Sequence, residues 1–164
     1  MKYVNETVRR QDRLLTEERA IELIKTSEYG VLSMITPDGE AYGLPLNYVW
    51  DGCESLYVHC APDGKKLECI GHCPSVSFCI VGNTNLLPAR FTTEYESVVM
   101  RCRAVIGLTD DEKHRAISLL IDKLSPDFKE IGEKYAEKSF HRVDVIRLDI
   151  VEFSGKCKFV PSAH

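Results

Sequence analysis

Two adjacent lysines, Lys65 and Lys66, are the residues whose position most directly predicts a chemical role. A strand that ends at Pro62, followed by a short helix over residues 63–71, would place both lysines in the first helical turn. Cations there oppose the helix dipole, which favours negative charge at that end by about 0.3–1 kcal/mol per group. A bound anion would reverse this penalty, because the free N–H groups at a helix start also bind anions. The pattern favours a phosphate site, and the alternative is two lysines that simply point into water.

His59 is the histidine with the clearest candidate role. Residues 57–60 have the pattern of a strand, in which successive side chains point to opposite faces. His59 and Cys60 therefore cannot form a nucleophile and base pair, and a thiol hydrolase is disfavoured. The other histidines lie near charged or terminal segments and are expected in solvent: His72, His114, His141 and His164.

A compact group of metal-binding residue types is formed by Cys69, His72 and Cys73. A helix would place the two cysteines on one face, but no second ligand pair lies at zinc-finger spacing. We therefore expect small buried thiols and no metal site. The chain has seven cysteines, an odd number in a chain long enough to fold without disulfides, which indicates reduced thiols.

Small residues share one face of the strand predicted over residues 41–50: Ala41, Gly43, Pro45, Asn47 and Val49. A proline in mid-strand removes a ladder hydrogen bond, which is tolerated at a sheet edge or where something flat lies against the backbone. Farther along, residues 82–90 are expected to form an irregular loop, a kind of element that often binds ligands. The polar run from Phe91 to Ser97 follows this loop.

The elements that must position these residues are about six strands and four helices. No strands alternate with helices in a repeating unit, so a mainly β fold, an antiparallel barrel with appended helices, is favoured over a doubly wound parallel sheet. A shift of apolar phase between Val145 and Ile146 predicts a bulge, and Ser154-Gly155 predicts a turn. The strands are expected at 29–36, 41–50, 55–60, 75–81, 92–107 and 142–153, and the helices after Thr16, over 63–71, after Thr109 and after Ser125.

Length and composition limit the classes of protein. The 164 residues, 44% hydrophobic and 28% charged, predict a single domain over 1–164 with its own core. A net charge of −4 without a basic stripe disfavours nucleic-acid binding. Polar residues interrupt the longest uncharged stretch, 69–89, so no membrane helix is expected. The charged start does not have the pattern of a signal peptide, which favours a cytoplasmic protein.

Several segments together resemble a known family over about residues 10–156. They are YGVLSMITPDGEAYGLPLNYV, LYVHCAPDGKKLECI, VSFCIVG and FTTEYESVV. They resemble the 5-nitroimidazole reductase (nitroimidazole-resistance) proteins of the pyridoxamine 5'-phosphate oxidase-like superfamily. The resemblance implies an FMN-binding split β-barrel that forms a homodimer and holds FMN at the subunit interface.

The resemblance also implies roles for particular residues. Lys65 stands where the superfamily often has histidine or arginine, which keeps the charge but loses the bidentate grip of arginine on phosphate. The chain ends without the tryptophan- and arginine-containing segment that vitamin-oxidising members use, so oxidation of pyridoxine phosphate is disfavoured. The implied site is Leu46, Asn47 and Tyr48 along the flavin, His59, Cys60 and Ala61 along its ribityl chain and ring, Lys65 and Lys66 at its phosphate, and Glu96 and Ser97 from the partner subunit.

These expectations define an FMN-dependent reductase. Electrons would pass from a reduced nicotinamide to a small electron-poor acceptor such as a 5-nitroimidazole or another nitro compound, with His59 as the proton donor or anchor. One alternative is a non-catalytic protein that stores, senses or transfers flavin or haem, with His59 as an axial ligand. Another is a barrel whose ligand site has decayed.

Overall fold

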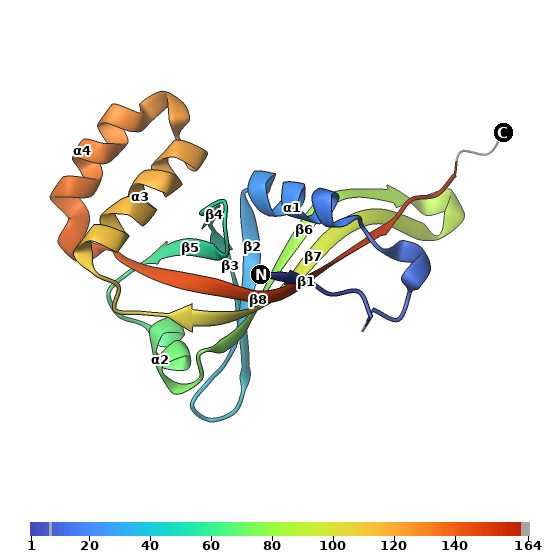
Figure 1. Ribbon diagram of the computed structural model, residues 1–164, viewed down its shortest axis with the longest axis horizontal. Coiled ribbons are helices and arrows are strands. Elements are labelled where there is room, and N and C mark those ends of the chain that lie inside the picture. The colour runs from blue at the N-terminus through green and yellow to red at the C-terminus, as the bar shows by residue number, and fades with distance from the viewer. Residues whose placement is uncertain (7, 162–164) are drawn as a thin grey trace.

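The computed structural model describes residues 1–6 and 8–161. Within them, eight strands form one sheet in the order β3-β2-β6-β7-β8-β5-β4, with β1 paired in parallel to β8. The strands are β1 (Lys2–Tyr3), β2 (Tyr29–Ile35), β3 (Ala41–Asn47), β4 (Val49–Trp50), β5 (Ser55–Cys60), β6 (Ser75–Leu87), β7 (Thr92–Val105) and β8 (Asp144–Lys158). The helices are α1 (Glu17–Thr26), α2 (Lys65–His72), α3 (Asp110–Leu124) and α4 (Lys129–Ser139). Figure 1 shows α3 and α4 at one end of the molecule and the tip of the β6–β7 hairpin at the other.

The sheet curls into a split barrel. Its two outermost strands, β3 and β4, are separated in the chain only by Tyr48, so the chain leaves one edge of the sheet and immediately enters the other. The Tyr48 side chain is completely buried, and its Oη donates a 2.6 Å hydrogen bond to the Ile24 carbonyl of α1. Except for the β1–β8 pair, the described strand pairs are antiparallel. The predicted antiparallel barrel with appended helices is confirmed.

Two hydrophobic cores lie on opposite faces of β5 and β8. The larger fills the barrel beneath α1, and the smaller lies between these strands and α3. Val145 belongs to the smaller core and Ile146 to the larger one. The bulge predicted between them is wrong, because β5 and β8 pair in unbroken register through both residues. The shift of apolar phase instead marks a strand that is buried on both faces. The irregularity in β8 lies farther along, where Val151 is left out of the pairing with β7.

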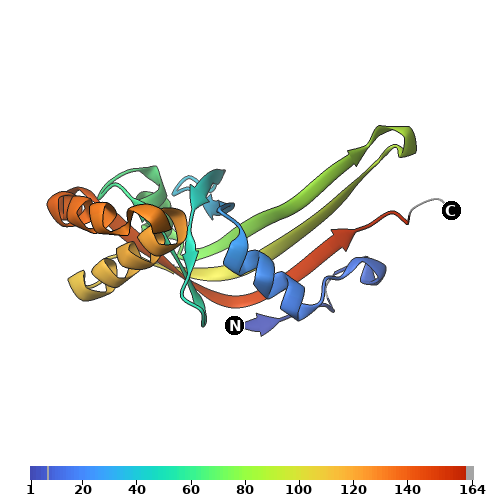
Figure 2. The ribbon, with the colours of Figure 1, turned by 90° about the horizontal axis from the view of Figure 1, so that it is seen from above.

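The loop predicted over residues 82–90 and the turn predicted at Ser154-Gly155 are largely strand in the structure. Residues 82–87 continue β6 and pair with β7 beyond a register shift, and a short 3₁₀ turn, Pro88–Arg90, closes the hairpin. This hairpin extends away from the barrel (Figure 2). Ser154-Gly155 does not turn, because β8 runs through it to Lys158. Gly155 is required by close packing there, since a Cβ atom would lie 2.9 Å from the Leu15 Cβ.

Two of the predicted helix starts, after Thr16 and after Thr109, are confirmed by their caps, and the helix predicted after Ser125 begins as the 3₁₀ turn Pro126–Phe128 before α4. Thr16 Oγ1 accepts a hydrogen bond from the Arg19 N–H at 3.2 Å, and Thr109 Oγ1 accepts one from the Glu112 N–H at 3.3 Å. These caps fix where α1 and α3 begin. None of the helices described is long and apolar enough to cross a membrane.

Candidate functional site

The start of α2 places Lys65 and Lys66 in the first helical turn, as predicted. The N-cap residue is Gly64, with φ at +120°, a conformation that favours glycine and leaves no side chain to cap the helix. Lys65 is exposed, and its Nζ lies 4.7 Å from the centre of the Tyr42 ring in β3. Lys66 is half-buried. The uncapped N–H groups and the two cations could together bind a phosphate group.

The edge strand β3 has the predicted alternation, with half-buried Tyr42, Leu44 and Leu46 on one face and small exposed residues on the other. The exposed Asn47 donates a 3.1 Å hydrogen bond from Nδ2 to the Glu28 carbonyl, which anchors the end of the strand. The Tyr48 ring lies inside the barrel with Lys123 Nζ 3.9 Å from its centre, so this side chain packs in the core. Burial lowers the pKa of Lys123 to about 8.

His59 and Cys60 face opposite sides of β5. Cys60 points into the main core, where burial raises the pKa of its thiol. The exposed His59 lines a cavity beneath α3 and α4. Ala61 follows at the exposed end of the strand. Of the histidines expected in solvent, His72, His114 and His141 are exposed, and the His114 ring stacks on Phe140 with ring centres 3.9 Å apart. His164 lies outside the described residues.

Glu96 and Ser97 lie on β7, away from the other predicted site residues. Glu96 is buried beside α1, where the Arg19 guanidinium donates hydrogen bonds of 2.8 and 2.7 Å to its two carboxylate oxygens. Lys65 begins α2 on the other side of the barrel (Figure 1). The structure thus places Lys65 of α2 beside Tyr42 of β3, whereas Glu96 and Ser97 lie on a different strand and pair there with β6 and β8. Whether a second copy supplies these two residues stays a prediction.

The ion pair between Arg19 and Glu96 predicts a pH-dependent stability. The Arg19 hydrogen bonds hold the pKa of Glu96 below its ordinary value, so the stabilisation is present above the pKa of the unfolded chain and is lost as the pH falls through the folded pKa. Glu96→Gln is expected to lower the free energy of unfolding by about 1–2 kcal/mol at pH 7. In urea titrations, this difference from the parent protein should shrink below about pH 4.

Glu22→Gln is the matched control, because Glu22 pairs with the same arginine but its side chain is 57% exposed. This control should change stability by less than about 0.5 kcal/mol. An equal loss in both variants would contradict the role assigned to Glu96.

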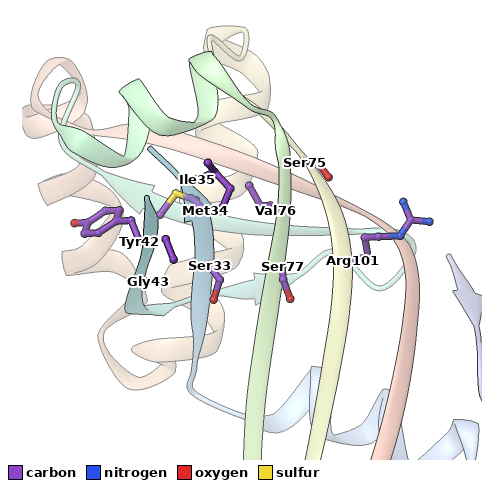
Figure 3. A pocket seen from close by; sticks show the side chains of 10 residues that line it. Ser33, Met34, Ile35, Tyr42, Gly43, Ser75, Val76, Ser77 and Arg101 are labelled. Atoms are coloured by element: carbon purple, nitrogen blue, oxygen red, sulfur yellow. The ribbon is translucent and has the colours of Figure 1, made fainter. Parts of the chain in front are cut away.

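A shallow groove of about 480 Å³ runs across the sheet beside Tyr42. Figure 3 shows Ser33, Gly43 and Ser77 on neighbouring strands, with Tyr42 at one side and Arg101 at the other. Arg101 Nε donates to Glu152 at 3.0 Å. Sequence reasoning missed the serines of this groove, although the alternate positions of Ser75 and Ser77 in β6 are a detectable signal.

Exposed apolar residues continue from the groove along the same sheet face. Val31 of β2 is paired with Cys79 of β6, and Cys79 with Val99 of β7, which forms a row across three strands. Val31 and Val99 are exposed, and so is Val81 farther along β6. An apolar sheet face of this kind is typical of protein interfaces.

Barrel topology and the residues at its edge place this chain among split-barrel proteins. The sequence matches the family described as Pyridoxamine 5'-phosphate oxidase over residues 16–157. The chain therefore belongs to this family. No curated protein matches the sequence significantly.

Solved structures share the fold at low sequence identity. The flavocytochrome Anf3 from Azotobacter vinelandii has a TM-score of 0.82 and 16% identity, with 100% of this chain and 79% of that chain covered. A candidate 5-nitroimidazole antibiotic resistance protein from Bacteroides thetaiotaomicron has a TM-score of 0.70 and 17% identity, covering 88% and 86%. An FAD-binding protein from Mesorhizobium loti has a TM-score of 0.62 and 23% identity, covering 90% and 98%.

Proposed function

We propose that the protein is an FMN-dependent reductase that transfers electrons from a reduced nicotinamide to a small electron-poor acceptor, such as a nitro compound. The observation that carries the proposal is the uncapped start of α2, where Lys65 and Lys66 lie beside the edge strand β3. Family membership and the flavin named for two of the similar structures support a flavin as the ligand. When bound, the flavin supplies the redox chemistry by accepting a hydride and passing electrons on.

The residues of the chain divide the work of binding and proton transfer. Lys65 and Lys66 bind the phosphate together with the first N–H groups of α2. One face of β3 carries small exposed residues up to Asn47 at its end. A flat group can approach the backbone along this face and the free edge of the strand. His59, near the end of β5, holds the acceptor and donates the proton that accompanies its reduction.

The proposed protein is a homodimer that assembles through the exposed sheet face. Val31, Cys79 and Val99 form a row that a second copy can bury by two-fold symmetry. Ser97 lies on the same face of β7 as Val99, which suits a contribution from the partner, whereas Glu96 faces α1 and would have to leave its ion pair with Arg19 to contribute. Sedimentation at micromolar concentration tests the dimer, and a monomer would contradict it.

The absorption spectrum of the purified protein tests the cofactor. Flavin bands that bleach on anaerobic addition of reduced nicotinamide are the expected result. The alternative function is flavin or haem binding without turnover, favoured by the free imidazole of His59 and by the flavocytochrome fold relative. A Soret band would support that alternative, and a protein that takes up neither group would exclude both functions.

Replacement of His59 tests its role in the reaction. His59→Ala is expected to retain FMN, because Lys65 and Lys66 are unchanged, but to reduce nitroaromatic compounds at least about 100-fold more slowly, the scale of general acid catalysis. Anaerobic stopped-flow spectroscopy measures flavin reoxidation by the acceptor. His72→Ala removes an exposed histidine at the end of α2 and should leave the rate unchanged. A parental rate in His59→Ala would contradict proton donation by this residue.

A further inference from the structure

A cavity of about 260 Å³ lies between β5 and the helical pair α3–α4. His59 is the residue of β5 that lines it. The walls are almost entirely apolar. They comprise Ile117, Leu120, Ile121 and Leu124 of α3, Ser125 directly after α3, Gly132, Tyr135, Ala136 and Ser139 of α4, and Val143. Figure 1 shows the two helices side by side at this end of the molecule. The cavity is separate from the groove beside Tyr42, with which it shares no lining residue.

The helical pair is held at both ends, so the cavity is built into the fold. Near the start of α4, Lys129 Nζ lies 2.7 Å from Asp122 Oδ1. Beyond its other end, the Phe140 carbonyl accepts a 3.0 Å hydrogen bond from Lys113 Nζ. Between these ties, α4 turns the small residues Gly132 and Ala136 toward α3. The cavity exists because these two positions lack large side chains.

The lining predicts the charge of the ligand. Within the described part of the chain, the walls contain no Asp, Glu, Lys or Arg, so an ion would lose hydration without gaining a permanently charged partner. Ser139 Oγ already accepts a hydrogen bond from Arg142. The His59 imidazole makes no hydrogen bond within residues 1–6 and 8–161, so it is free to bind one polar group of a ligand. A neutral molecule with a single polar substituent fits these walls.

The volume predicts the size of the ligand. A dry apolar cavity of roughly 150 Å³ holds benzene, so about 260 Å³ suits a ring compound of about ten non-hydrogen atoms. FMN has roughly three times that number of atoms and does not fit, which separates this cavity from the cofactor site. His59 of β5 thus faces a compartment of acceptor size.

We infer that the cavity beneath α3 and α4 binds the acceptor, and that the acceptor is a small uncharged aromatic compound whose polar substituent contacts His59. The inference rests on the proposed function in naming this ligand the acceptor. The apolar walls gain from covering an aromatic ring, and the imidazole orients its substituent.

Nitrobenzene and benzoate test the inference, because they have nearly the same size and shape and differ in charge. Isothermal titration calorimetry with the purified, oxidised protein measures binding without turnover. Nitrobenzene is expected to bind at least tenfold more tightly than benzoate and to shift the NMR signals of the His59 imidazole. Equal binding of the two compounds would overturn the inference.

Ala136→Leu fills the cavity and is expected to weaken nitrobenzene binding at least tenfold. Lys138→Leu adds the same side chain on the exposed side of α4 and should bind nitrobenzene as the parent does. Gly132→Ala, whose new Cβ would lie 3.0 Å from Ile121 Cγ2, is a milder variant in case the leucine disturbs α4. Unchanged nitrobenzene binding in both cavity variants would overturn the inference.

FMN content separates this inference from the proposed function. Both cavity variants should retain the FMN of the parent protein, because α2 is unchanged. A parent protein that holds no FMN but binds nitrobenzene in this cavity would contradict the reductase while supporting the cavity as a ligand site. A protein that holds FMN but binds nitrobenzene elsewhere would contradict the cavity as the acceptor site while leaving the flavin-binding function supported.

Discussion

Replacing both Lys65 and Lys66 by glutamate is expected to lower FMN affinity by at least about 100-fold. Each lysine contributes a charge-assisted contact to the phosphate, worth about 1.5–3 kcal/mol, and every 1.4 kcal/mol is about tenfold in affinity. The two glutamates also repel the phosphate from the uncapped helix start. Quenching of flavin fluorescence during titration measures the dissociation constant.

The control for this double variant is Lys134→Glu with Lys138→Glu. It makes the same change of net charge on exposed positions of α4, so general electrostatic repulsion acts in both variants. This control should keep the parental FMN affinity to within about threefold. If Lys65→Glu with Lys66→Glu bound FMN as tightly as the parent, the start of α2 would not be the phosphate site.

Gly30→Ala is expected to lower the free energy of unfolding by about 3 kcal/mol, the upper part of the range for overpacked cores. Gly30 lies on the buried face of β2, where a Cβ atom would lie 2.4 Å from Phe78 Cε1 and 2.8 Å from the Cys79 carbonyl oxygen. The Phe78 ring is held in turn by an edge contact with Tyr48 at 5.1 Å between ring centres. Neither neighbour can yield easily, because one is backbone and the other is a fully buried ring.

Thermal and urea unfolding measure this loss, which corresponds to a Tm lower by roughly 6–12 °C for a chain of this size. Gly71→Ala provides the matched control, since the new Cβ in α2 would have no atom within 4 Å. Alanine should stabilise that helix by about 0.5–1 kcal/mol. A Gly30→Ala protein as stable as the parent would show that the barrel wall adapts more readily than its packing indicates.

Much of the barrel is predictable because its strands alternate between the core and an exposed face. The alternation in β2 and β3 and the capping threonines gave correct elements without knowledge of their partners. Residues 82–87 were missed because this part of β6 faces solvent and lacks an apolar pattern, so pairing with β7 alone makes it a strand. Gly155 was predicted to form a turn, but a glycine is needed there because Leu15 and Ala20 pack closely against it, and both are distant in sequence.

The candidate site was predictable to a similar extent. The lysines at the start of α2 are local features of the chain, so their placement was correct. The cavity facing His59 was missed because it depends on how α3 and α4 pack over β5. The spacing of Gly132, Ala136 and Ser139 in α4 was a signal for close helix packing, but it does not indicate what lies opposite. The ion pair of Glu96 with Arg19 likewise joins residues far apart in the sequence.

The chain passes directly from β3 through Tyr48 into β4. This short connection joins the two edge strands of the sheet. Tyr48 is anchored in the core and on α1, so it acts as a fixed pivot between them. Because β4 pairs with β5, this connection also holds the edge strand β3 in place relative to the strand that carries His59. The seam of the barrel couples the strand beside Lys65 to the strand that carries the imidazole.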